Sequence, residues 1–85
     1  LVVLIGRVTY TGRTSMEVRV DTYAESGDGM GKPVNRAYFV MVAMDEEDKP
    51  TPVPILKVET ESQRAEWEGA LKRRELRSLR RRDGF

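Results

Sequence analysis

The 85-residue sequence contains no cysteine and no histidine. Without cysteine the chain has no disulfide framework, no thiolate nucleophile and no zinc–thiolate site, which fits a reducing compartment, and we expect a cytoplasmic location. Without histidine it lacks the commonest general base and the commonest metal ligand. A catalytic triad therefore cannot be assembled from this chain alone.

Long apolar runs are also missing. Leu1–Ile5 is apolar, but it is followed at once by Gly6 and Arg7, and a bilayer-spanning helix needs about 20 apolar residues. We interpret this run as a strand and expect no membrane partner. The sequence also lacks an initiator methionine and opens inside this strand, so we expect it to be part of a longer protein.

The length and the charge distribution set further limits. A chain of 85 residues has room for one domain, and a domain of this size buries only a limited core. The net charge is +1, yet residues 72–85 carry seven basic and two acidic side chains, whereas residues 1–71 carry eight basic and twelve acidic ones. The basic character is concentrated at the C-terminal end.

Hydrophobic periodicity predicts an α+β chain, with an antiparallel sheet followed by one helix. The strands are expected at about 1–10, 14–25, 35–45 and 53–59, and the helix at about 61–82. Ser26–Lys32 contains three glycines and is expected to be a loop.

The second predicted strand has one apolar and one polar face. Its apolar residues include Met16, Val18 and Val20. We expect this face to be buried. On the other face, Glu17 and Asp21 are expected to face solvent or to pair with Arg7 and Arg19 across the hairpin.

The turn between the first two strands is a candidate anion site. Gly12 supplies the backbone freedom that a tight reversal needs. Arg13, Thr14 and Ser15 then bring a guanidinium, two hydroxyls and several amide N–H groups into one short segment. Such a segment can hold an anion.

Asp45–Asp48 is a run of four acids, followed by three prolines at positions 50, 52 and 54. A metal site is one interpretation, but consecutive carboxylates cannot all point at one ion, and the spacing of a calcium loop is missing. We favour a solvated hairpin tip and predict no metal site.

The C-terminal helix has a well-marked start, because Thr60 and Gln63 form a possible capping box. Its narrow apolar stripe indicates a helix that lies on a surface. Its basic end can be a solvated helix terminus, a surface for nucleic acid or another acidic partner, or a source of arginines for the phosphates of a small ligand. No aromatic residue interrupts Lys72–Arg82, which disfavours RNA recognition by stacking.

Several motifs together resemble the acyl-CoA thioesterases (acyl-CoA hydrolases) of the hotdog fold. The motifs are V-x-Y-T-G-R-T-S-M-E-V at Val8–Val18, N-R-A-Y-F-V-M-V-A-M-D at Asn35–Asp45, K-P-x-P-V-P at Lys49–Pro54 and W-E-x-A-x-x-R-R at Trp67–Arg74. Their order and spacing agree with the family. The resemblance spans about residues 6–80.

The resemblance implies a hotdog domain, in which a curved antiparallel sheet wraps around a long central helix and two domains pair with a coenzyme A (CoA) site across their interface. This chain would be the C-terminal part of one domain, with the later strands and the closing helix. The central helix and the residues that activate water would precede Leu1. An apolar sheet face, including some of Val18, Val20, Phe39 and Met41, would then be uncovered in this chain, and we expect further polypeptide or other copies to cover it.

The resemblance also implies hydrolysis of acyl-CoA to a fatty acid and CoA by the full-length protein, a reaction of fatty acid metabolism. CoA would be part of substrate and product, and no other cofactor is required. No catalytic residue is expected in this chain, which should be inactive alone. The alternative is a noncatalytic module that uses its basic helix on nucleic acid or an acidic partner.

The candidate CoA contacts implied by the resemblance are Thr14, Ser15, Met16 and Arg74, with Arg13 and Arg73 added by proximity and charge. Met16 can equally be a core residue. Asn35 matches a family motif, but its place at a strand start favours a backbone hydrogen bond over chemistry. The expected partners are acyl-CoA and further copies of the protein.

Overall fold

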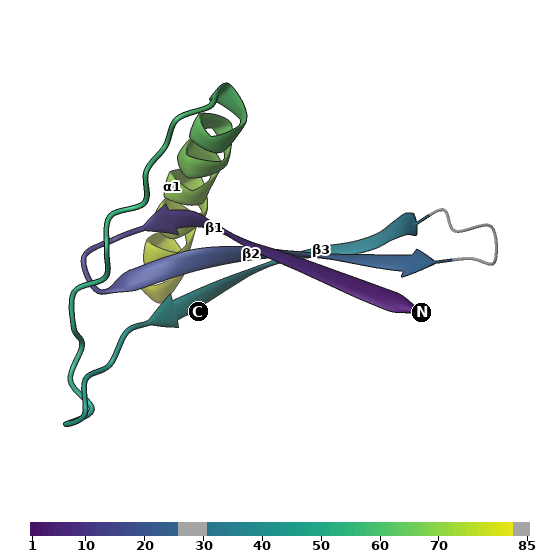
Figure 1. Cartoon of the computed structure of the whole chain (residues 1–85). Coiled ribbons are helices and arrows are strands. Elements are labelled where there is room, and N and C mark those ends of the chain that lie inside the picture. Colours follow the sequence, from purple (N-terminus) through teal and green to yellow (C-terminus); the bar gives the residue numbers. More distant parts are fainter. Residues whose placement is uncertain (26–30, 83–85) are drawn as a thin grey trace.

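The computed structural model describes residues 1–25 and 31–82. They form a three-stranded antiparallel sheet in the order β1-β2-β3, with one long helix packed against it (Figure 1). The elements are β1 (Val2–Thr11), β2 (Ser15–Glu25), β3 (Gly31–Val42) and α1 (Glu61–Arg82). The predicted α+β class and the predicted bounds of the helix are confirmed.

The strand register divides the sheet into two faces. Val8 lies opposite Val18, and Val18 opposite Phe39, so these residues share what we call the apolar face. Glu17 lies opposite Tyr10 and Val40 on the other side, which we call the helix face because α1 packs there. β1 contains a register shift between Val8 and Tyr10, where Thr9 is the extra residue.

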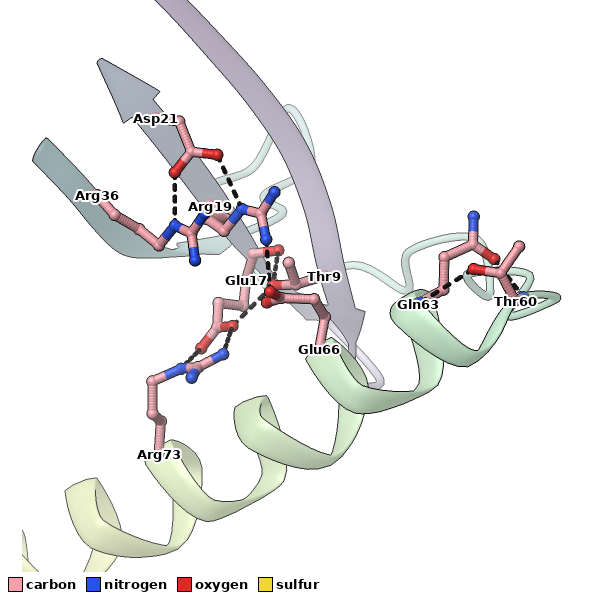
Figure 2. A network of polar contacts seen from close by, with 9 residues as sticks. All are labelled: Thr9, Glu17, Arg19, Asp21, Arg36, Thr60, Gln63, Glu66 and Arg73. Atoms are coloured by element: carbon pink, nitrogen blue, oxygen red, sulfur yellow. Dashed lines mark hydrogen bonds and ion pairs between the residues drawn. The ribbon is translucent and has the colours of Figure 1, made fainter. Parts of the chain in front are cut away.

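The start of α1 is fixed by a reciprocal cap. The backbone N–H of Gln63 donates to the Thr60 hydroxyl at 3.1 Å, and the Gln63 side-chain oxygen accepts from the backbone N–H of Thr60 at 3.0 Å. Each contact satisfies a donor that the first turn of a helix leaves unpaired. The predicted capping box is confirmed (Figure 2).

The apolar face is uncovered in the described part of the chain. Phe39 and Met41 of the edge strand β3 are 49% and 52% exposed, and Leu4 of the opposite edge strand β1 is 66% exposed. Among the described apolar residues, Ala70 of α1 forms the fully buried core. The expectation that this chain leaves the face open is confirmed. No helix in residues 1–25 or 31–82 combines the length and the apolar character needed to cross a bilayer.

The strand predicted at 53–59 was wrong. Prolines at 50, 52 and 54 lack N–H donors. The backbone N–H groups of the other residues in this segment donate to different parts of the chain and do not pair with a neighbouring strand. Val53 N–H donates to the Arg13 carbonyl at 3.0 Å, and Leu56 N–H donates to the Thr11 hydroxyl at 2.9 Å. The segment therefore crosses the end of the sheet as an irregular strap on its way to α1 (Figure 1).

The third strand was also placed too late, since β3 runs over Gly31–Val42 and not 35–45. Gly31 and Lys32 pair with β2, so they belong to the sheet, while residues 26–30 of the predicted loop lie outside the described residues. After β3, Met44 forms an isolated bridge with Pro50. The Asp45 carboxylate accepts the N–H groups of Glu47 and Lys49, which closes the acidic segment into a turn.

Candidate anion-binding site

The carbonyl groups of the β1–β2 turn accept hydrogen bonds from backbone N–H groups, which fix the conformation of the turn. Gly12 N–H donates to the Ser15 carbonyl at 2.8 Å, Ala43 N–H donates to the Thr14 carbonyl at 2.8 Å, and the Arg13 carbonyl is bound to the strap. A Cβ atom at Gly12 would lie 3.2 Å from the Ser15 hydroxyl and 3.5 Å from Arg74 Nη1. The absence of a side chain at Gly12 lets α1 approach the turn.

A hollow of about 250 Å³ lies between this turn and α1. Four of the predicted contacts line it, namely Thr14, Ser15, Met16 and Arg74. It is also lined by Arg77 and Arg81, which the sequence reasoning did not select. Their spacing of three and four residues places all three arginines on one side of the helix, and this spacing was the signal that could have found them.

Arg74 keeps its charge available. Its Nη1 donates to the Tyr10 hydroxyl at 2.7 Å, and its guanidinium lies 5.8 Å from the centre of the Tyr10 ring. Tyr10 in turn packs on Trp67, with 4.4 Å between ring centres. Within residues 1–25 and 31–82 no carboxylate forms an ion pair with Arg74. The guanidinium is oriented by a neutral group and can still bind an anion.

The guanidinium of Arg73 is bound to another residue of the chain, Glu17. Its Nε donates to one carboxylate oxygen of Glu17 at 3.0 Å, and its Nη2 donates to the other at 2.7 Å (Figure 2). The guanidinium also lies 3.6 Å from the centre of the Tyr38 ring. Arg73 is not among the residues that line the hollow, and neither is Arg13, whose side chain is exposed.

Glu17 does not face solvent, so that part of the prediction was wrong. The residue is 2% exposed, and the hydroxyl of Thr9 donates to its Oε1 at 2.7 Å. Burial would raise the pKa of Glu17, but the hydrogen bonds from Arg73 and Thr9 and the charges of Arg73 and Arg77 outweigh this, and the pKa lies below its ordinary value of 4.5. With both oxygens already accepting hydrogen bonds, Glu17 is poorly placed to act as a general base.

A second ion-pair group binds the N-terminal half of α1. Arg19 contacts Glu66 of the helix and lies 3.2 Å from Asp21, so Asp21 does pair with Arg19, but within β2 and not across the hairpin as predicted. Arg36 donates to the same Asp21 carboxylate at 2.7 Å and lowers the pKa of Asp21 by that hydrogen bond. The helix face is thus held by charged contacts at two places (Figure 2).

The remaining sequence candidates lie elsewhere. Asn35 is inside β3, opposite Thr22, and does not line the hollow. Among the described residues no group of His, Cys, Asp or Glu side chains is arranged to hold a metal ion.

Comparison with known proteins was made by sequence and by structure. No protein-family model matches the chain. A crystal structure of a hexameric acyl-CoA thioesterase matches with a TM-score of 0.85 and 40% identity, covering 93% of this chain and 51% of that one. The acyl-CoA hydrolase of Bacillus cereus matches with a TM-score of 0.85 and 32% identity, covering 96% and 51%.

This chain is related to the hotdog-fold acyl-CoA thioesterases. The motif resemblance is confirmed, and the three-stranded sheet with its helix matches about half of such a chain. The acyl-CoA hydrolase of Staphylococcus aureus, solved in complex with butyryl coenzyme A, coenzyme A and coenzyme A disulfide, also matches, with a TM-score of 0.82 and 29% identity over 96% of this chain and 51% of that one.

The relatives found by sequence agree. This chain is 38% identical over 81 residues to protein VdlD of Helicobacter pylori, and the match covers 92% of this chain and 45% of that protein. It is 32% identical over 72 residues to the cytosolic acyl coenzyme A thioester hydrolase of Rattus norvegicus, covering 80% of this chain and 19% of that protein. The chain therefore spans less than half the length of these relatives.

Proposed function

We propose that the complete protein to which this chain belongs hydrolyses acyl-CoA thioesters, and that this chain supplies the site for the phosphorylated end of CoA. The observation that carries the proposal is the hollow in which Thr14, Ser15 and Arg74 meet. Hydroxyls and guanidinium groups are the side chains that bind phosphate oxygens well. The S. aureus relative solved with CoA supports the choice of ligand.

Each group has a distinct part in this proposal. The hydroxyls of Thr14 and Ser15 donate to phosphate oxygens, and Arg74, presented by Tyr10, supplies a charged fork. Arg77 and Arg81 extend the row of cations along α1, with successive turns about 5.4 Å apart. Such a row suits a ligand that carries more than one phosphate, as CoA does.

The hydrolytic step needs groups beyond this site. Water must add to the thioester carbonyl carbon, the carbon–sulfur bond must break, and the CoA sulfur must gain a proton. Glu17 is the carboxylate at the hollow, and it is already bound by Arg73 and Thr9. We therefore assign the water-activating residues to the rest of the complete protein or to a second copy, and expect the 85-residue chain alone to bind CoA without turning over acyl-CoA.

We also propose an oligomeric state and a cellular location. We propose a homo-oligomer, since the first structural relative is hexameric, and a cytosolic location, since the rat relative is named cytosolic. No cofactor beyond the CoA of the substrate is required. The competing function is a noncatalytic module that binds nucleic acid through the exposed arginines of the last turns of α1.

The proposal is tested by CoA binding to the complete protein with Arg74→Gln and, as a matched control, Lys72→Gln. Both changes remove one positive charge from α1, but only Arg74 lines the hollow. Because a hydrogen bond to a charged group is worth about 1.5–3 kcal/mol, Arg74→Gln should weaken binding by about tenfold or more. Fluorescence of Trp67, which packs on Tyr10, is a local readout.

Equal effects of the two substitutions would mean that only the net charge of the helix matters, which contradicts the proposed site. Displacement of CoA by mixed-sequence RNA, with no acyl-CoA hydrolysis by the complete protein, would favour the nucleic-acid module. Turnover of acyl-CoA by the pure 85-residue chain would contradict the assignment of the chemistry to residues outside it.

A further inference from the structure

Glu17 presents an electrostatic conflict at the proposed site. It lines the hollow together with Thr14, Ser15 and Arg74, and it is ionised at neutral pH, since burial does not raise its pKa above the ordinary value of 4.5. A carboxylate at the floor of a site opposes an anionic ligand unless it is neutralised or does something that outweighs the repulsion. The contacts that Glu17 makes indicate its role.

The contacts of Glu17 join three elements. Thr9 donates from the bulge of β1, Glu17 itself stands on β2, and Arg73 donates through two nitrogens from α1. A two-point guanidinium–carboxylate contact fixes direction as well as distance. It therefore sets both the axial position and the rotation of α1 against β2.

The rotation of the helix decides where the neighbouring arginine points. Successive residues of an α-helix are turned by about 100°. With Arg73 directed at Glu17, Arg74 is directed toward Tyr10 on β1 and approaches Gly12 of the turn. Arg77, one turn further along, lies 4.0 Å from the same carboxylate and also lines the hollow.

We propose that Glu17 is a positioning residue for the anion site, which binds Arg73 and thereby orients α1 so that Arg74 and Arg77 face the Thr14–Met16 segment. This inference rests on the function proposed above. Glu17 does not touch the reacting atoms. It lowers the KM for acyl-CoA through the orientation of the helix, at the cost of placing a negative charge near the ligand.

Two explanations predict opposite results for Glu17→Gln. If Glu17 mattered only by its charge, the loss of a negative charge at the site would tighten CoA binding. Under the positioning account the charge-assisted contact to Arg73 is lost, Arg74 and Arg77 are less well oriented, and binding weakens. We expect the KM for acyl-CoA to rise about fivefold, as for residues coupled through direct contact, with kcat within about twofold.

Glu17→Gln combined with Arg73→Gln keeps the net charge of the site unchanged and leaves no buried unpaired charge. The positioning account predicts weaker CoA binding by this double variant than by the native protein, similar to that of Glu17→Gln alone. Unchanged or tighter binding by either variant would overturn it. Because the double variant has no unpaired buried charge, it decides the question even where a single variant is poorly folded.

A truncated substrate separates positioning from a general loss of structure. Acyl-pantetheine has the thioester but lacks the phosphorylated nucleotide, so its kcat/KM should be the same in native protein and in Glu17→Gln. An equal loss with both substrates would mean that Glu17 only stabilises the fold, which overturns the proposal. If Arg74→Gln also leaves CoA binding unchanged, the proposed function fails; if only the Glu17 variants do so, this inference alone fails.

Discussion

The two faces of the sheet are built in opposite ways. On the helix face, charged side chains are covered by α1, and Glu17 is 2% exposed while bound to Arg73 and Thr9. On the apolar face, Phe39 and Met41 are about half exposed, and nothing in the described residues covers them. Soluble domains usually place side chains in the reverse order. The comparison indicates that the buried charges of the helix face find their partners within this chain, whereas the described residues leave the apolar face uncovered.

The largest expected effect breaks the charged contact of the helix face. Arg73→Met would leave the buried Glu17 with Arg77, 4.0 Å away, as its remaining ion-pair partner, and breaking a buried ion pair costs about 3–5 kcal/mol of unfolding free energy. We expect a value near the lower end, because Arg77 remains near the carboxylate and the Arg73 side chain is 29% exposed to water. Urea denaturation of the complete protein at pH 7 measures the change.

Lys72→Met is the matched control, since Lys72 is exposed and forms no ion pair with another described residue. It should change the free energy of unfolding by less than about 0.5 kcal/mol. Similar losses for Arg73→Met and Lys72→Met would show that the ion pair with Glu17 does not hold the helix face.

The apolar face is tested by comparing two neighbours in β3. Phe39 and Val40 are 49% and 48% exposed, but they lie on opposite faces. We expect the isolated 85-residue chain to associate through the apolar face, because soluble monomers rarely expose a large contiguous apolar patch. Phe39→Ser should reduce association in sedimentation experiments, and Val40→Ser should not. A monodisperse monomer of the unchanged chain would contradict this account of the face.

The pH dependence of stability sharpens the account of the helix face. Because the pKa of Glu17 is lowered in the folded state, its contribution to stability is fully present above the ordinary pKa of 4.5 and is lost as the pH falls through the lowered value. The native protein should therefore lose more unfolding free energy than Glu17→Gln between pH 7 and acid conditions. Asp21 is retained in both proteins, so the difference isolates Glu17. If the native protein and Glu17→Gln lost the same unfolding free energy on acidification, the ion pair assigned to Glu17 would be contradicted.

The smallest effect is expected at the start of α1, outside both faces. Thr60→Ala removes the hydroxyl that accepts the Gln63 N–H and should cost about 1 kcal/mol of unfolding free energy. CoA affinity should be unchanged, since neither residue lines the candidate site. A drop in CoA affinity as large as that of Arg74→Gln would show that binding follows overall helix stability and not the orientation of individual arginines.

Local signals in the sequence predicted the helix and its cap, because Thr60 and Gln63 act within one turn. They did not predict which sheet face α1 covers. The alternation of apolar and polar residues defines two faces of a strand, but it does not show what packs on each face. The contact that decides this joins Glu17 and Arg73, which are 56 positions apart. Proximity and charge added Arg73 to Arg74 as a candidate contact, although the structure shows Arg73 bound to Glu17 and Arg74 bound to Tyr10.

The strand predicted at 53–59 failed for a different reason. Apolar residues continue through the strap, but its backbone donors are bound by the β1–β2 turn and by a side chain. Four residues selected from the sequence as CoA contacts, Thr14, Ser15, Met16 and Arg74, line one hollow. Arg77 and Arg81 were missed, although their helical spacing with Arg74 was present in the sequence.

The central claim is that the hollow on the helix face binds CoA. Modification of arginines by phenylglyoxal, followed residue by residue with mass spectrometry in the complete protein, tests it directly. CoA should slow the modification of Arg74 and leave that of Arg64, an exposed arginine outside the hollow, unchanged. Equal modification rates of Arg74 with and without saturating CoA, or protection of Arg74 by RNA and not by CoA, would contradict the claim.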